Sequence, residues 1–145
     1  MIRRLRDDRG SILPLVAFFG ALALVVILLA SAASSLYLER KRLFTMADDA
    51  ALVGAEAFDV DDVPIVDGHP RPRLQPVDVA DAVGRYLAAT DTTEFEQLRV
   101  DRATTVDGQS ATVELSAFWR PPVVTLFVPR GIRVEVTASA RSVFE

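Results

Sequence analysis

The sequence of 145 residues contains no cysteine and a single histidine, His69. The absence of cysteine excludes a disulfide framework, thiol catalysis and cysteine metal sites. His69 stands in a Gly-His-Pro stretch typical of a surface turn, with no nucleophile and carboxylate arranged around it. The sequence also lacks Gly-x-Ser-x-Gly, a glycine-rich phosphate loop and His-Glu-x-x-His. We therefore predict a protein that is not an enzyme and binds no cofactor or small-molecule substrate.

Basic residues are fewer than acidic ones. The net charge is −4, and the chain beyond Ala57 is mildly acidic. No basic stripe is present, so nucleic-acid binding is not expected. The one dense carboxylate cluster comprises Asp59, Asp61, Asp62 and Asp67. Its spacing does not match a calcium loop, and no bidentate Glu follows at the required distance. A solvated acidic loop is the preferred interpretation, and no metal site is predicted.

One long apolar run is present. Ile12 to Ala33 carries no charge, and roughly 20 apolar residues suffice to cross a bilayer as a helix. We predict a basic tail over 1–10 and a transmembrane helix over 11–35, with regular helix beginning at about Pro14. The stretch Ala30-Ser31-Ala32 offers the alternative of signal-peptidase cleavage, although the apolar region before it is longer than in a usual signal peptide.

Basic residues lie on both sides of this run: Arg3, Arg4, Arg6 and Arg9 before it, and Arg40, Lys41 and Arg42 after it. The positive-inside rule compares such short flanks and slightly favours a cytoplasmic N-terminus. A short N-terminal tail and a folded C-terminal domain fit the same orientation. We expect a single-pass protein of the cell membrane with its C-terminal domain outside the cytoplasm.

The helical pattern continues beyond the membrane over 36–58. A narrow stripe of mostly small residues recurs there at helical spacing: Leu43, Ala47, Ala50, Gly54 and Ala57. Small residues four apart allow another backbone to approach closely. The stripe either covers the protein's own sheet or packs on other subunits, and both can hold at different heights along one helix.

The rest of the chain predicts a proline-rich loop over 59–76 and a small α+β domain over 77–145. A second helix is expected to be capped by Asp78 and to end at about Ala89 or Thr90. Three antiparallel strands should follow, with an Asp-Gly turn between the first two and one helical turn between the last two: 94–105, 111–119 and 132–140. Trp119 is either a core or edge aromatic over the sheet or an interface residue. The two helices should cover the apolar face of the sheet.

Three segments together resemble the N-terminal region of TadE/TadG-like proteins of Flp (tight adherence) pilus assembly in bacteria. They are Asp8-Arg9-Gly10-Ser11 before the anchor, Tyr37-Leu38-Glu39-Arg40-Lys41-Arg42-Leu43 after it, and the block Ala47-Asp48-Asp49-Ala50-Ala51-Leu52-Val53-Gly54-Ala55. The Ala-Asp-Asp-Ala-Ala-Leu block is more similar to the TadG-like branch. The resemblance implies a bitopic inner-membrane protein with a pilin-like domain, whose partners are the lipid bilayer and other pilus or secretion-system membrane subunits.

The resemblance also implies a candidate processing site at Gly10 and Ser11. Prepilin peptidase substrates of this system have Glu at the fifth position after the glycine, whereas this chain has Leu15 there and no Glu before Glu39. We therefore expect an anchored, pseudopilin-like assembly component rather than the bulk pilin. The alternatives are a membrane-anchored binding module unrelated to pili, which would use the proline-rich loop or the Trp119 edge, and a small exported enzyme.

Overall fold

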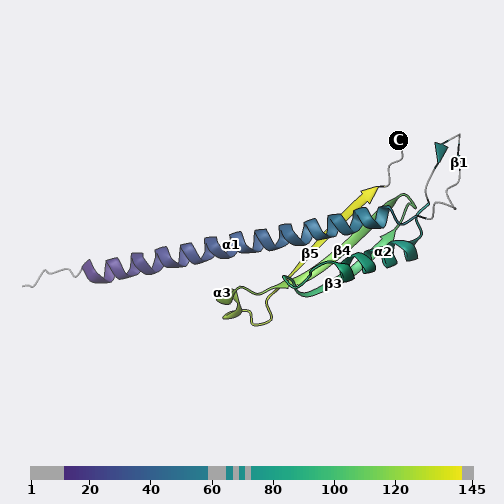
Figure 1. Cartoon of the computed structure of the whole chain (residues 1–145). Coiled ribbons are helices and arrows are strands. Elements are labelled where there is room, and N and C mark those ends of the chain that lie inside the picture. Colours follow the sequence, from purple (N-terminus) through teal and green to yellow (C-terminus); the bar gives the residue numbers. More distant parts are fainter. Residues whose placement is uncertain (1–11, 59–64, 67–68, 71–72, 142–145) are drawn as a thin grey trace, which may run out of the picture.

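The structure is a computed structural model that describes residues 12–58, 65–66, 69–70 and 73–141. Its elements in chain order are α1 (Ile12–Ala55), β1 (Ile65–Val66), β2 (His69–Pro70), α2 (Pro76–Ala89), β3 (Glu96–Thr105), β4 (Ser110–Trp119), α3 (Pro122–Thr125) and β5 (Ile132–Arg141). Figure 1 shows α1 as a long rod, with the other elements gathered along its C-terminal half. The predicted α+β class is confirmed: a long apolar helix, a short helix and a three-stranded antiparallel sheet.

The sheet has the order β3-β4-β5, and both pairs are antiparallel. The expected Asp-Gly turn joins β3 to β4, and Gly108 adopts a φ of 67°, which glycine reaches without steric cost. β4 and β5 pair without interruption from Ser110↔Arg141 to Trp119↔Ile132. The β3–β4 ladder contains two irregularities. Bulges of this kind are a common feature of edge strands such as β3.

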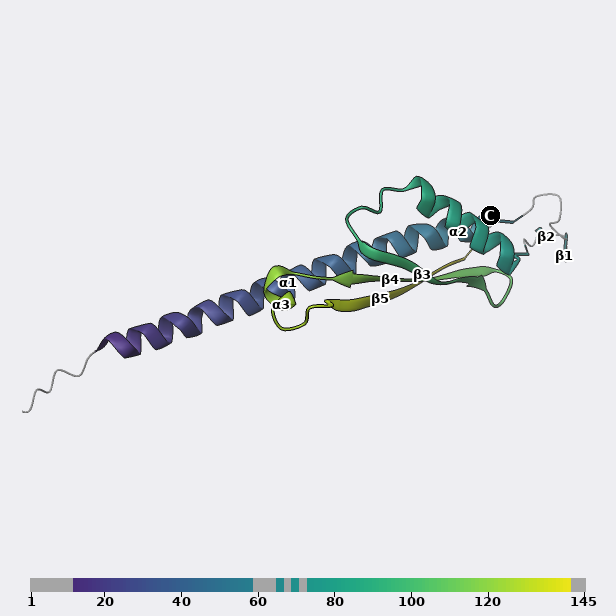
Figure 2. The same cartoon turned by 90° about the horizontal axis from the view of Figure 1, so that it is seen from below.

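Both helices lie on one face of the sheet, as Figure 2 shows, with α1 along β4 and β5 and α2 beside β3. The period of two along β5 dictates this arrangement, because every second side chain must be covered. Val134, Val136, Ala138 and Ala140 are buried, and the residues between them are exposed. The core is completed by the alternate residues of β4 and by the facing sides of the two helices.

The bounds of α1 differ from the expected ones at both ends. Ile12 is already helical, two residues before Pro14. The first four N–H groups of a helix have no intrahelical acceptor, so a proline at the third position loses no hydrogen bond. At the other end α1 stops at Ala55 and not at residue 58. Gly54 already lies against Ala111 near the start of β4, so further turns would have no sheet to cover.

The expected cap of the second helix is wrong. α2 begins at Pro76, one residue into the expected loop, with Gln75 and not Asp78 as its N-cap. A proline at the first helical position has a suitable φ and lacks an N–H that would be unpaired there. Asp78 lies in the first turn, where a negative charge is favourable beside the helix dipole. The expected end is confirmed, because α2 ends at Ala89 with Thr90 as its C-cap.

Candidate functional site

The contact between the upper half of α1 and the sheet contains most of the residues that the helical stripe singled out. Leu43, Ala47 and Ala50 have no exposed surface, and Gly54 is also buried. We call these four residues the α1 seam. Ala57, the fifth residue of the predicted stripe, is half-buried and lies beyond the end of the helix.

The buried surface of α1 is wider than the predicted stripe. Met46, Ala51 and Ala55, each adjacent in sequence to a seam residue, are also buried. The reason is that α1 contacts the sheet on one side and α2 on the other. A second buried row therefore runs beside the first, and the sequence pattern alone did not reveal the position of α2.

At Gly54, α1 lies close to both α2 and β4. A Cβ atom built on Gly54 would lie 3.1 Å from Ala111 Cβ, 3.1 Å from Val79 Cγ1 and 3.5 Å from Val83 Cγ2. The first two separations are shorter than an ordinary carbon–carbon contact. The absence of a side chain at Gly54 is therefore what allows the three backbones to pack at this distance.

The lower half of α1 has the opposite environment. Every residue from Ile12 to Ser31 is exposed, although this stretch is the most apolar part of the chain. Within the described residues, α1 is the one helix long and apolar enough to cross a membrane. A helix of 20 residues is about 30 Å long, which matches the hydrocarbon thickness of a bilayer.

The two halves of α1 meet at a contact with the end of β4. Ala32 and Leu36 are half-buried and pack against the core. Trp119 is 6% exposed, and its Nε1–H donates a hydrogen bond to Ser35 Oγ at 3.2 Å. Trp119 is thus a core residue, and its interpretation as an interface residue is wrong. This contact holds the Trp119 end of the sheet about one helical turn beyond Ser31, where the fully exposed part of α1 ends.

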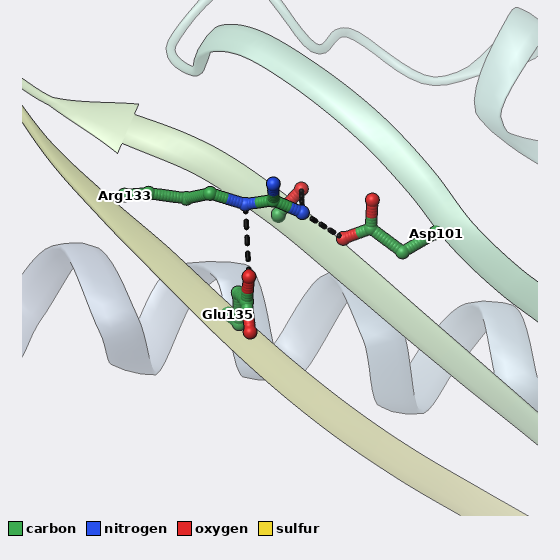
Figure 3. A network of polar contacts seen from close by, with 4 residues as sticks. Asp101, Arg133 and Glu135 are labelled. Carbon is green, nitrogen blue, oxygen red and sulfur yellow. Dashed lines mark hydrogen bonds and ion pairs between the residues drawn. The ribbon is translucent and has the colours of Figure 1, made fainter.

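The outer face of the sheet carries a polar network that links all three strands (Figure 3). Arg133 Nη2 on β5 donates to Asp101 Oδ2 on β3 at 2.9 Å and to Ser116 Oγ on β4 at 3.2 Å. Arg133 Nε lies 2.9 Å from Glu135 Oε1. A hydrogen bond with Ser116, together with Arg133, holds the pKa of Asp101 below its ordinary value. Within this network the charged groups of Arg133, Asp101 and Glu135 pair with one another.

A shallow groove of about 270 Å³ separates α1 from α2. It is lined by Arg42, Thr45, Met46, Asp49, Tyr86, Thr90, Asp91 and Glu94. Arg42 Nη1 lies 3.6 Å from Glu94 Oε2 across it, and both side chains are more than half exposed. Exposed pairs of this kind contribute about 0–1 kcal/mol to stability. The groove offers mixed charge but no nucleophile beside a base.

The carboxyl groups with shifted pKa values lie on different elements: Glu39 on α1, Asp91 after α2, Asp101 on β3 and Asp107 in the turn before β4. At the lower end of the head, partial burial raises the pKa of Glu39; Arg42 opposes this, and Glu94 and Glu96 add to it. In the turn between β3 and β4, backbone N–H groups lower the pKa of Asp107 to about 2. Within the described ranges, no three carboxylate or histidine side chains gather as metal ligands would. These shifts do not converge on a catalytic centre.

Several residues named from the sequence lie outside the described ranges: Gly10, Ser11, Asp59, Asp61, Asp62 and Asp67. His69 belongs to β2, whose backbone pairs with β1 through Val66↔His69 and Ile65↔Pro70. This two-residue ladder occupies part of the expected proline-rich loop.

Sequence reasoning missed one surface. Leu126 and Phe127, which follow α3, are 79% and 83% exposed, and Val128 is 41% exposed. They belong to an apolar run between Pro122 and Pro129, where the sequence predicts one helical turn between the last two strands. That turn is confirmed, but the run alone does not show that these side chains point away from the core.

Comparison with known proteins gives one matching family model. Residues 10–57 match the family model described as "Putative Flp pilus-assembly TadE/G-like". No curated protein matches the chain, and no solved structure does. The match spans the whole of α1, including the exposed apolar half and the α1 seam. The N-terminal region of this chain, residues 10–57, is therefore similar to the TadE/G-like family of Flp pilus assembly.

Proposed function

We propose that the protein is a membrane-anchored, pseudopilin-like and non-catalytic component of Flp/Tad-type pilus assembly. The observation that carries the proposal is the construction of α1 inside the family match. One unbroken helix of 44 residues combines an exposed apolar half with a half that packs beneath the sheet. A head domain fixed rigidly to its anchor is suited to lateral packing in a membrane or filament.

In this proposal the N-terminus is cytoplasmic and the α+β head lies outside the cytoplasm. The α1 seam is occupied by the protein's own sheet, so contacts with other subunits would use the remaining surface of α1. Phe44 and Leu52 are about half exposed and lie on that surface. We place the chain in the TadG-like branch on its Ala-Asp-Asp-Ala-Ala-Leu block, and we propose that it is an assembly component rather than the bulk pilin.

Co-purification tests this function. The full-length protein, extracted from its native membrane in mild detergent, is expected to bring pilus platform subunits with it. A matched bait with Phe44 and Leu52 both changed to Ser should fold and retain its anchor but recover less of these partners. Recovery of a stable lone monomer from pilus-forming cells would contradict the proposal and favour an anchored binding module unrelated to pili.

N-terminal sequencing of the membrane-extracted protein tests the anchor. A start at Met1 supports an uncut assembly component, and a start at Ser11 would indicate a processed pseudopilin. A start at Ala33 would show a secreted head and would defeat the anchored model.

A further inference from the structure

The segment from Pro121 to Gly131, which we call the α3 loop, presents apolar side chains to solvent at one end of the sheet. Leu126 and Phe127 are consecutive and among the most exposed large apolar residues of the described chain. Isolated exposed leucines are common on protein surfaces, but consecutive exposed apolar residues indicate a binding surface. A surface of this kind requires a partner that covers it.

The position of the α3 loop indicates the occupant. In both views α3 lies beside the middle of α1, at the end of the sheet nearest the exposed apolar half (Figures 1 and 2). Trp119, three residues before the start of α3, is hydrogen-bonded to Ser35. Ser35 is four residues past Ser31, or roughly 6 Å along the helix axis. This distance is about the thickness of one headgroup layer of a bilayer.

The backbone of the α3 loop is suited to a poorly hydrated environment. Prolines at 121, 122 and 129 carry no N–H, and several of the remaining N–H groups are paired inside the loop. Val124 and Thr125 donate to Pro121 O, and Phe127 and Val128 donate to Val124 O. Unpaired backbone groups are costly away from water, so this pairing lowers the cost of burial among lipids.

The loop is also held in place at its base. Gly131 N donates to Val128 O at 2.9 Å, and Arg120 Nε donates to Arg130 O at 3.2 Å. Gly131 has a φ of 75°, and a side chain there would collide with Arg120 and with Trp119 O. Val124 points the other way and packs against the core. The exposed side chains therefore project from a defined structure.

We propose that the α3 loop inserts Leu126 and Phe127 into the bilayer surface, as a second membrane contact beside α1. The inference rests on the anchoring of α1 in the proposed function. Lipid is the occupant because the loop lies beside the end of the exposed apolar half of α1. Its apolar side chains therefore extend the surface that α1 presents to lipid. Exposed Arg130 lies next to the apolar residues, where it can meet lipid phosphates. The insertion would limit rotation of the head about α1.

The absence of cysteine gives a clean background for depth measurements. Full-length single-cysteine variants Phe127→Cys, Leu24→Cys and Val106→Cys are labelled with an environment-sensitive fluorophore. They are reconstituted in phosphatidylethanolamine and phosphatidylglycerol vesicles. Leu24 lies in the lower half of α1, and Val106, 89% exposed, lies at the opposite end of the sheet. Quenching is measured with aqueous iodide and with a lipid that carries a nitroxide near its headgroup.

The label at Phe127 is expected to be quenched several-fold less by iodide and several-fold more by the nitroxide lipid than the label at Val106. If Phe127 behaves like Val106 while Leu24 is shielded, the inference is overturned and the anchor stands. An iodide-accessible Leu24 would defeat the anchor and this inference with it. A Phe127 label shielded from both quenchers would show a protein contact and overturn lipid as the occupant.

A charge substitution gives a second readout. With the label on Leu126→Cys, the change Phe127→Asp should restore iodide quenching, because a charge is expelled from the lipid surface. Val106→Asp is the matched control and should leave the signal unchanged. Since both positions are exposed, neither change should affect folding, and unchanged shielding in the Phe127→Asp variant would contradict lipid insertion.

Discussion

The two halves of α1 have the same backbone conformation and opposite relationships to their surroundings. From Ile12 to Ser31 large apolar side chains cover the helix, and all are exposed. In the upper half the buried residues are mainly alanine and glycine, whereas Phe44 and Leu52 are exposed. The buried face of the upper half is thus built from smaller side chains than the exposed surface of the lower half.

The difference shows that side-chain size, and not hydrophobicity alone, distinguishes the two environments. A helix in lipid can carry large apolar side chains all round, because the solvent adapts to their shape. A helix that packs on a sheet and on α2 needs small residues, because the distances between the backbones are fixed. Three comparisons of substitutions and two comparisons of pH dependence test this distinction.

The largest effect is expected at the two glycines of α1. Gly54→Leu should destabilise the head by about 3 kcal/mol or more, because its side chain would overlap Ala111 and Val79. Gly20→Leu is the matched control, since nothing lies within 4 Å of a Cβ atom there. Denaturant unfolding in detergent, followed by the fluorescence of buried Trp119, measures both. Equal stability of the two variants would show that Gly54 does not limit the packing.

The second comparison places the same charge in both halves. Leu24→Lys should make insertion of α1 about 3 kcal/mol less favourable, because a lysine at the centre of a membrane helix is costly. Leu52→Lys should have little effect, although Leu52 and Leu24 are similarly exposed, at 51% and 58%. The fraction of protein retained in carbonate-washed membranes measures insertion. Equal retention would indicate that the lower half is not in lipid.

Much of the fold follows from periodicity in the sequence. The alternation along β5 and the recurrence of Val79, Ala82 and Val83 on α2 identify elements whose faces must be buried, and the structure buries them. Element ends were less predictable, because they depend on tertiary contacts. Gln75 became the cap through the preference of Pro76 for the first helical position, which outweighed the capping ability of Asp78.

The candidate site shows the same limit. Helical spacing locates the row from Leu43 to Gly54, but it does not predict the burial of Met46 beside that row, which depends on where α2 docks. Likewise, the apolar run before Pro129 gave no sign of its exposure. The exposure of a loop depends on tertiary packing, as does the bond between Trp119 and Ser35, two residues 84 positions apart. Contacts at such separation have no local signature.

The third prediction concerns this bond, at the boundary between the two halves. Ser35→Ala should destabilise the attachment of β4 to α1 by about 1 kcal/mol, the usual net value of one hydrogen bond. Trp119→Phe should cost more, because it also removes buried volume. A double-mutant cycle, followed by circular dichroism in detergent, isolates the bond. A coupling energy near zero would show that the two groups do not interact in solution.

A smaller effect is expected from Asp107, at the end of the sheet remote from the exposed apolar half of α1. Its folded pKa of about 2 lies below its ordinary value of 3.8. Asp107 therefore contributes stability above its ordinary pKa, and this contribution is lost as the pH falls from about 4 towards 2. Asp107→Asn should lower stability at neutral pH and weaken the loss in acid. Unfolding curves at several pH values test this, and identical pH profiles for both proteins would contradict it.

The smallest effect should come from Glu39, at the lower end of the head. Its contribution to stability has the opposite pH dependence to that of Asp107. Partial burial raises its pKa, with Glu94 and Glu96 adding to the shift against Arg42. A raised folded pKa contributes stability that is present below the ordinary value of 4.5 and is lost as the pH rises through the folded value. Glu39→Gln should thus slightly stabilise the head at neutral pH. The variant should also lack the increase in stability that the unchanged protein shows on mild acidification. Asp48→Asn, at an exposed carboxyl on the same helix, is the control for the loss of one negative charge. A destabilised Glu39→Gln variant would show that the charged form is favoured at position 39.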